Sequence, residues 1–229
     1  MLYRGVSMNN EIKAITIEDN EKFLRQISTP VDIKNDSNLL NYINSLEQFC
    51  LNNEVMAMAA VQIGIPKRLI YLKNTNLEII NRSQTDSKTE KDKKYNEARV
   101  LINPIIIKRK GLTEYWEACR SGLDNCGKVL RPYIIYVEYY DVIGNKHIER
   151  FEGFESTVLS HEMDHLDGIL HIDIAEEIVR LSVEERKKLR QKEGYLIHSK
   201  SGDYENLKIE KQKNLVITQK NLAKTYKTK

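Results

Sequence analysis

The sequence predicts an α+β fold in which antiparallel β-sheets pack around a central helix, with a further helix near the C-terminus. Segments of strand-like composition follow one another through the middle of the chain, and segments with helical periodicity lie before and after them. Strands in succession followed by helices are typical of this class. The 229 residues suffice for one domain with a sizeable core.

The first predicted helix covers residues 36–53. Its apolar residues recur at the spacing of one helix face, and they are Leu39, Ile43, Leu46 and Cys50. Asp36 or Ser37 can cap the helix start. Cys50 lies on the apolar face, so we expect it in the core. The preceding segment 28–33 contains Ser-Thr-Pro, which disfavours helix and predicts an extended chain.

Strands are predicted at 67–73, 100–110 and 112–121, and two more at 131–153 around a turn at 143–145. Residues 81–97 contain no aliphatic side chain, which predicts a polar insertion loop.

The central helix is predicted at 155–167, where Val158, Leu159, Met163 and Leu166 are apolar and Gly168 follows the last turn. A later helix at 182–194 begins at Ser182 and carries its acidic residues early and its basic residues late, as the helix dipole favours.

Composition limits the class of protein. Apolar residues make up 41% and charged residues 30%, and no apolar run is long enough to span a bilayer. The N-terminal residues lack the hydrophobic segment of a secretory signal, so we expect a cytoplasmic protein without a membrane partner. Three cysteines, an odd number, argue against a disulfide framework.

The stretch HEMDHLDGILH (161–171) indicates a metal site. His161 and His165 lie four residues apart, so on a helix both imidazoles project from one face and can reach one ion. Glu162 stands beside the first histidine, where a carboxylate can take a proton from a metal-activated water. The helix is otherwise apolar, so a polar cluster on it needs a reason.

The third ligand has two candidates. His171 completes the pattern H-E-x-x-H-x-x-G-x-x-H of one metalloprotease class. That class also needs a methionine downstream, and the five methionines all precede His171. Glu184 or Glu185 could supply a carboxylate ligand instead, but they fit better as capping acids of the helix at 182–194. Cys119, at the end of a strand, would add a thiolate to the two imidazoles, a set that suits Fe²⁺ or Zn²⁺.

Three segments together resemble the peptide deformylase family. They are VMAMAAVQIG (55–64), EACRS (117–121) and HEMDHLDG (161–168), in the family's order and approximate spacing. The resemblance covers roughly residues 15–195. It implies a hydrolase that removes the formyl group from the N-terminal formyl-methionine of new polypeptides.

The resemblance also implies roles for particular residues. Cys119, His161 and His165 would hold one divalent metal ion, for which Fe²⁺ is preferred and Zn²⁺ is the alternative. Glu162 would be the general base. The Gln62 amide and the backbone N–H of Arg120 would stabilise the oxyanion. Substrate backbone would bind along Met56, Ala57 and Met58, and an apolar pocket would take the methionine side chain.

Several positions depart from the family pattern. Val55 and Ala57 replace two glycines of the first segment, Ala118 replaces the glycine before Cys119, and Arg120 replaces an apolar residue. These changes leave the ligands, Glu162 and Gln62 in place, so they bear on rate and substrate range. A catalytically silent homologue that binds peptides or ribosomes is a third hypothesis, beside the deformylase and the metalloprotease.

The chain is expected to divide into a deformylase-like catalytic domain at 1–198 and a flexible basic tail at 199–229. The tail contains eight lysines and three acids, more positive charge than the net +3 of the whole chain. The tail and the helix at 182–194 could contact ribosomal RNA, whereas no DNA partner is expected.

Three smaller expectations concern residues near the motif. Asp164 is expected to be structural and to pair with Arg131. Cys126 is not expected to be a ligand. His171, on the deformylase hypothesis, is expected to be a surface or strand residue.

Overall fold

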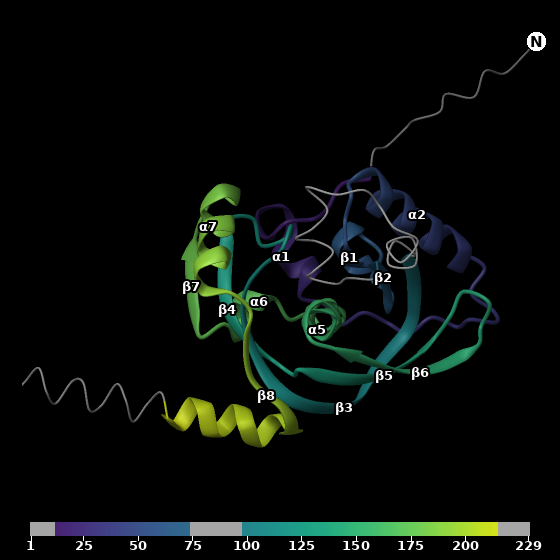
Figure 1. Cartoon of the computed structure of the whole chain (residues 1–229). Helices are drawn as coiled ribbons and strands as arrows, with labels where there is room; N and C mark the ends of the chain where they lie inside the picture. Colours follow the sequence, from purple (N-terminus) through teal and green to yellow (C-terminus); the bar gives the residue numbers. More distant parts are fainter. Residues whose placement is uncertain (1–11, 74–97, 215–229) are drawn as a thin grey trace, which may run out of the picture.

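The structure is a computed structural model and describes residues 12–73 and 98–214 (Figure 1). Its elements in chain order are α1 (Ile17–Leu24), α2 (Leu39–Asn52), β1 (Ala57–Ala59), the 3₁₀ helix η1 (Ala60–Ile63), β2 (Leu69–Lys73), β3 (Ala98–Ala118), β4 (Asn125–Arg131), β5 (Ile134–Tyr140), β6 (Lys146–Glu152), α5 (Phe154–Leu166), α6 (His171–Ile174), β7 (Glu177–Arg180), α7 (Val183–Glu193) and β8 (Leu196–Asp203). Residues 204–214 are also helical. The predicted α+β class is confirmed.

The described strands form one eight-stranded antiparallel sheet, with the order β1-β2-β3-β4-β7. β5 and β8 also pair with β3, and β6 pairs with β5. The 21-residue β3 is therefore the spine of the sheet, and Figure 1 shows it curving beneath α5.

The sequence predicted two strands where β3 is continuous, and Gly111 explains the difference. Its φ of +68° bends the strand without ending it. A Cβ at this position would lie 2.5 Å from the Ser199 carbonyl oxygen and 2.8 Å from the Tyr133 Cβ. Only glycine lets β8 and the start of β5 approach the bend so closely.

The central helix lies where the sequence predicted it. α5 runs through the hollow of the curved sheet (Figure 1). Its side chains Leu159, Met163 and Leu166 pack in one cluster with sheet residues such as Ile70 and Leu101. Beyond the helix, Gly168 has a φ of +72°, and a Cβ there would lie 2.3 Å from the Arg25 carbonyl oxygen. α5 is thus fixed by burial on its flanks and by a close backbone approach at its end.

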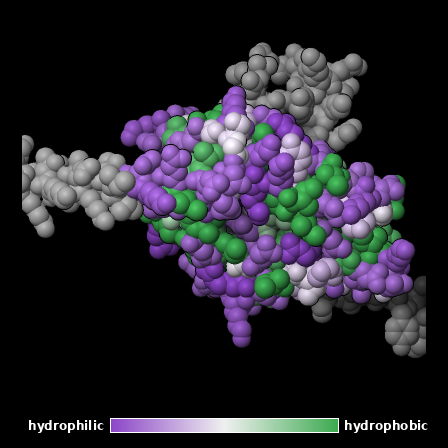
Figure 2. Space-filling model, turned by 90° about the horizontal axis from the view of Figure 1, so that it is seen from below, coloured by the Kyte–Doolittle hydropathy of each residue, from purple (hydrophilic) through white to green (hydrophobic). Residues whose placement is uncertain are grey.

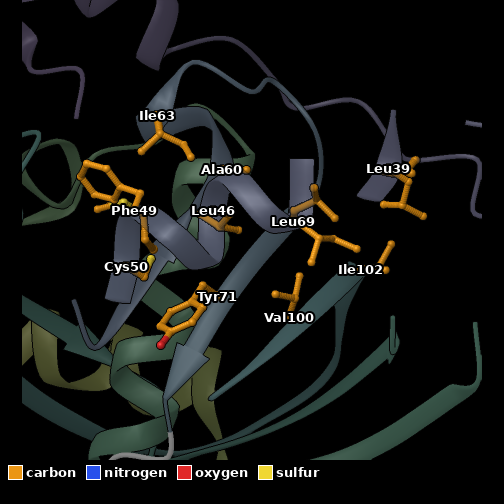
Figure 3. Packing of buried hydrophobic residues seen from close by; sticks show 13 residues of the cluster. Leu39, Leu46, Phe49, Cys50, Ala60, Ile63, Leu69, Tyr71, Val100 and Ile102 are labelled. Atoms are coloured by element: carbon orange, nitrogen blue, oxygen red, sulfur yellow. The ribbon is translucent and has the colours of Figure 1, made fainter. Parts of the chain in front are cut away.

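A second apolar cluster holds α2 against β1 and β2 (Figure 3). Leu46, Phe49 and Cys50 of the helix face Leu69 and Tyr71 of the strand. The periodicity of residues 36–53 predicted this face, and Cys50 is a core residue as expected, with 1% of its surface exposed.

The C-terminal part differs from the prediction. The expected boundary at residue 198 falls inside β8, which pairs with β3, and the helix 204–214 follows directly. Tyr204 is buried with Leu112 and Leu130, and its hydroxyl donates to the Leu130 carbonyl oxygen at 3.1 Å. Backbone pairing and one aromatic anchor hold this segment, and neither depends on a long apolar pattern. The predicted insertion at 81–97 lies outside the described residues.

Figure 2 views the molecule from the side of β3 and β5, where hydrophobic patches are interspersed with hydrophilic ones. Exposed isoleucines of β3 and β6, at 105, 107 and 148, contribute apolar surface. Scattered apolar side chains of this kind are ordinary on protein surfaces. Among the described helices, none has the length and apolar character needed to cross a bilayer.

Candidate active site

Two separate elements bring three potential metal ligands together. Cys119 follows the last residue of β3, and His161 and His165 lie one turn apart on α5. Their ligand atoms all lie within 4.8 Å of one another. The Cys119 Sγ is 3.2 Å from the His165 Nε2. One sulfur and two nitrogen donors in this arrangement fit a single Fe²⁺ or Zn²⁺ ion and leave a coordination position open.

A series of charged hydrogen bonds fixes the orientation of the His161 ring. The His161 Nδ1 lies 2.8 Å from the Glu117 Oε2, to which it can donate, leaving Nε2 for a metal. Arg131 donates to both oxygens of Glu117, at 2.7 and 2.9 Å, and to the Asp164 carboxylate at 2.5 Å. The expected pairing of Asp164 with Arg131 is present and spans from β4 to α5. These contacts orient the imidazole before any ion binds.

The charges of the cluster favour the ionised forms of Glu117 and Cys119. Burial opposes ionisation of Glu117, but the Arg131 guanidinium beside it holds the pKa of that carboxyl well below its usual range. Burial also opposes the Cys119 thiolate, yet the His165 and His161 imidazoles lower the pKa of the thiol well below its ordinary value. A thiolate is the form that binds metal.

Glu162 lies next to the cluster and is held by one backbone donor. The Ala59 N–H donates to its Oε2 at 2.8 Å. The side chain is buried, and this burial raises the pKa of its carboxyl above the ordinary value of 4.5. A carboxylate with a raised pKa is a better proton acceptor, as a general base requires.

Gln62 links three parts of the site. Its Oε1 accepts the Ala59 N–H at 3.1 Å, and its Nε2 donates to the Cys119 Sγ at 3.2 Å and the Ser121 Oγ at 3.1 Å. The side chain is 2% exposed. Its amide is therefore aimed at the metal cluster with little freedom to rotate.

A cavity of about 300 Å³ opens beside these residues. Met56, Ala57 and Met58 line one side, in and before the edge strand β1. Tyr115, Phe154 and Val158 supply apolar surface on another side; Arg120 lies in the lining as well. The cavity thus joins the metal cluster, the edge of β1 that no other described strand pairs with, and an apolar wall. All the predicted site residues except the wholly buried His165 line it.

The other candidate ligands are not part of the three-residue cluster. His171 begins α6 and is 1% exposed, so it is a buried residue and the expectation of a surface position is wrong. Its Nε2 is 3.1 Å from the Asn125 carbonyl oxygen, and its ring packs against that of His161. Cys126 is buried within β4 and lies outside the cluster. Glu185 accepts hydrogen bonds at the Ser182 cap of α7.

Sequence reasoning did not assign roles to Glu117 and Ser121. Strand alternation offered a signal for Glu117, because residues two apart on a strand share a face, and Cys119 is two residues on. Ser121 orients Gln62 across a loop, a contact that no local pattern reveals.

This fold and this site are those of a metal-dependent hydrolase in which a buried glutamate stands beside a Cys-His-His cluster that could hold a metal ion. The family model for polypeptide deformylases matches residues 12–180 of the chain. The chain therefore belongs to the polypeptide deformylase family.

Individual relatives agree with this. The chain is 36% identical over 163 residues to the peptide deformylase of Pelagibacter ubique, covering 71% of this chain and 85% of that protein. It is 32% identical over 185 residues to that of Rhizorhabdus wittichii, covering 77% and 97%. A crystal structure of a peptide deformylase from Synechococcus elongatus in complex with actinonin is similar, with a TM-score of 0.58 and 28% identity over 80% of this chain and 85% of that chain. The Met-Ala-Ser-bound peptide deformylase of Acinetobacter baumannii has a TM-score of 0.58 and 25% identity, covering 71% and 96%.

Proposed function

We propose that this protein removes the formyl group from the N-terminal formyl-methionine of newly made polypeptides. One observation carries the proposal: Glu162 lies beside a Cys-His-His cluster in a cavity bounded by the edge of β1 that no other described strand covers. A peptide could bind along such an edge with its first amide bond at the cluster.

The residues of the site divide the reaction between them. Glu162 accepts the proton of the attacking water and then passes it to the leaving amine, which leaves formate and a free N-terminus. The Arg120 N–H and the Gln62 N–H that faces the Cys119 sulfur donate to the formyl oxygen as negative charge develops on it. Removing one donor of this kind typically reduces the rate by ~10²-fold or more.

Cys119, His161 and His165 are the proposed ligands of one divalent ion. When bound, such an ion polarises a carbonyl oxygen and lowers the pKa of water. Fe²⁺ is the preferred ion and Zn²⁺ the alternative, because a thiolate with two imidazoles suits both. The ordered Glu117–His161 contact supports the assignment, since metal-ligating histidines usually donate their other nitrogen to such a partner.

Substrate binding uses β1 and the apolar wall. An extended peptide that pairs with residues 56–58 would add a strand to the sheet edge. The methionine side chain would then lie near Tyr115, Phe154 and Val158. The methyl group of Ala57 narrows this path relative to glycine.

The cellular setting is part of the same proposal. A deformylase of new polypeptides works in the cytoplasm, close to the ribosome. The basic residues of α7 support contact with ribosomal RNA, because five of its eleven residues are lysine or arginine.

Formate release from formyl-Met-Ala-Ser by the anaerobically prepared, metal-loaded protein tests the function. We expect Glu162→Gln to retain the metal and lose ~10²–10⁴-fold in kcat/KM, because an amide does not accept the proton. Glu155→Gln is the matched control, since Glu155 lies on the same helix but outside the cavity lining.

Two outcomes would overturn the proposal. Activity of Glu162→Gln within about tenfold of the parent excludes Glu162 as the base. A fully metal-loaded parent that releases no formate from any formyl peptide favours the silent homologue.

A further inference from the structure

Two arginines from different elements line the cavity that contains the metal cluster. Arg120 follows Cys119 in the loop after β3, and Arg190 lies in the last turn of α7. Arg190 also lies beyond residues 12–180, where the chain matches the family model. The arginine pair is therefore a feature of this chain that the shared motifs do not explain.

Arg120 is held over the cavity entrance by neutral groups. Its guanidinium lies 5.8 Å from the centroid of the Phe49 ring, and its Nη1 donates to the Asn53 Oδ1 at 3.3 Å. Both partners belong to the end of α2. A cation–π contact and an amide acceptor leave the positive charge of Arg120 uncompensated.

Arg190, elsewhere in the cavity lining, is also held by a neutral acceptor and an aromatic ring. Its Nε donates to the Trp116 carbonyl oxygen at 2.9 Å, and its guanidinium lies 5.2 Å from the centroid of the Tyr115 ring. These contacts fix the plane of the guanidinium, and within the described part of the chain its two Nη groups keep their donors for another acceptor. A preorganised guanidinium fork matches a carboxylate.

Neither arginine has an acidic partner among the described residues. Elsewhere in the same part of the chain Arg25, Arg68, Arg99 and Arg131 all pair with carboxylates. Two acids of the cavity lining have other partners or positions. Glu117 pairs with Arg131, and Glu162 faces the cluster. Glu54 is the remaining acid of the lining, and it is exposed.

We propose that Arg120 and Arg190 recognise a carboxylate on the substrate, so that the enzyme favours formyl-methionyl peptides with an acidic group close to the methionine. This inference rests on the proposed deformylase function and adds a substrate class to it. The carboxylate can come from an Asp or Glu side chain or from the C-terminus of a short peptide. Both sources present the same planar acceptor to the two guanidinium groups.

The size of the preference follows from partial exposure. Arg120 is exposed and Arg190 is half-buried, so solvent and salt screen both charges. We expect kcat/KM for an acidic peptide to exceed that for its basic counterpart by about tenfold at low salt, and by less at high salt. Arginine stays charged at every working pH, so the preference does not follow the titration of these side chains.

The experiment compares four peptides in the metal-loaded enzyme. They are formyl-Met-Asp-Ser amide, formyl-Met-Lys-Ser amide, neutral formyl-Met-Ala-Ser amide, and formyl-Met-Ala with a free carboxylate. The readout is the ratio of kcat/KM between peptides within one enzyme, so a change in overall activity or in folded fraction cancels. The two acidic arms separate a side-chain carboxylate from a C-terminal one.

Some variants should lower the acidic-to-basic ratio of kcat/KM, and one should raise it. Arg120→Leu and Arg190→Gln should each reduce the acidic preference by about threefold, and the double variant should abolish it. Arg190→Lys, which keeps the charge, should retain most of it. Glu54→Gln should raise it, because the variant removes the exposed acid of the lining.

Arg186→Gln is the matched control. Arg186 lies one turn earlier on α7, donates to the Leu123 carbonyl oxygen and is outside the cavity lining. Its ratio should equal that of the parent. The inference is overturned if the parent processes the neutral peptide but shows no acidic preference, or if the preference survives in the double variant. Failure to release formate from any peptide would instead refute the proposed function.

Discussion

Two buried carboxylates stand three residues apart on β3, and they serve opposite sides of the sheet. Glu114 is 3% exposed and Glu117 is 5% exposed. Because side chains alternate along a strand, Glu117 faces the metal cluster whereas Glu114 faces β8 and the helix 204–214. Each carboxylate is surrounded by basic groups. The two sites therefore show how a guanidinium differs from lysine and histidine as the partner of a buried carboxylate.

The cation beside Glu117 is a buried guanidinium. Arg131 binds both carboxylate oxygens and reaches Asp164 on α5 as well. Such a fork fixes direction as well as distance. The Glu117 carboxylate, which accepts from the His161 Nδ1, is therefore held in a single orientation.

The groups beside Glu114 are looser. Lys128 lies 2.9 Å from its carboxylate, His198 lies 3.2 Å away, and Lys211 of the helix 204–214 also contacts it. Their side chains are 20–32% exposed. These flexible cations join a peripheral segment to the sheet. Pairing of a buried carboxylate with cations therefore orients His161 on one side of β3 and attaches the C-terminal segment on the other.

The largest expected difference between the two sides is in stability. Arg131→Met leaves Glu117 and Asp164 buried without their partner, and breaking a buried pair in this way costs about 3–5 kcal/mol. Lys128→Met, the counterpart beside Glu114, should cost about 1 kcal/mol or less, because other cations remain. Urea unfolding of the metal-loaded variants measures both. Equal losses in the free energy of unfolding would mean that the Arg131 guanidinium stabilises the fold no more than the Lys128 ammonium does.

A smaller effect separates the two carboxylates themselves. Glu117→Gln keeps an acceptor for the His161 Nδ1 but removes its charge, so we expect metal affinity to fall about 10–100-fold. Glu114→Gln, on the other face of the same strand, should leave metal affinity within about twofold of the parent. Competition with a chelator gives both values. A comparable loss in Glu114→Gln would show that the effect travels through β3 and not through His161.

The two sides also differ in how far the sequence predicted them. His161, His165 and Glu162 follow from helix geometry, because a four-residue spacing places both rings on one face. Cys119 was one of two candidates for the third ligand, and the family resemblance favoured it over His171; Gln62 follows only from that resemblance. The contacts of Arg131 with Glu117 and Asp164 join β4, β3 and α5. Of these contacts, only the pairing of Arg131 with Asp164 was expected.

Elements with strong apolar periodicity were predicted, as was the polar helix α7 from its Ser182 cap and charge order, whereas short or polar strands were not. The predicted apolar faces of α2 and β5 match their burial. β1 has three residues, and β8 reads LIHSKSGD, in which polar residues prevail. Such strands are held by backbone bonds to a neighbour far along the chain, and side-chain patterns do not encode that pairing. For this reason the sequence did not reveal that the expected boundary at 198 lies within β8.

The smallest expected effect concerns the attachment of the helix 204–214 and its dependence on pH. Burial raises the pKa of Glu114, but Lys211 and Lys128 outweigh it and lower that pKa from 4.5 to about 2. A carboxyl with a depressed pKa in the folded state adds stability that is fully present above its unfolded pKa and is lost as the pH falls towards the folded one. The contribution of Lys211 should therefore be constant at neutral pH and decline between about pH 4.5 and 2.

We expect Lys211→Met to reduce the free energy of unfolding by about 1 kcal/mol at pH 7. The difference from the parent should shrink as the pH is lowered from 4.5, because protonated Glu114 no longer attracts the ammonium group. Lys208→Met is the matched control on the same helix, since Lys208 lies over the Tyr204 ring at 5.7 Å. Its difference from the parent should not change with pH in this range. A pH-independent effect of Lys211→Met in urea unfolding would mean that the helix is held by Tyr204 and the β8 backbone, and that the Glu114 cluster contributes nothing to its attachment.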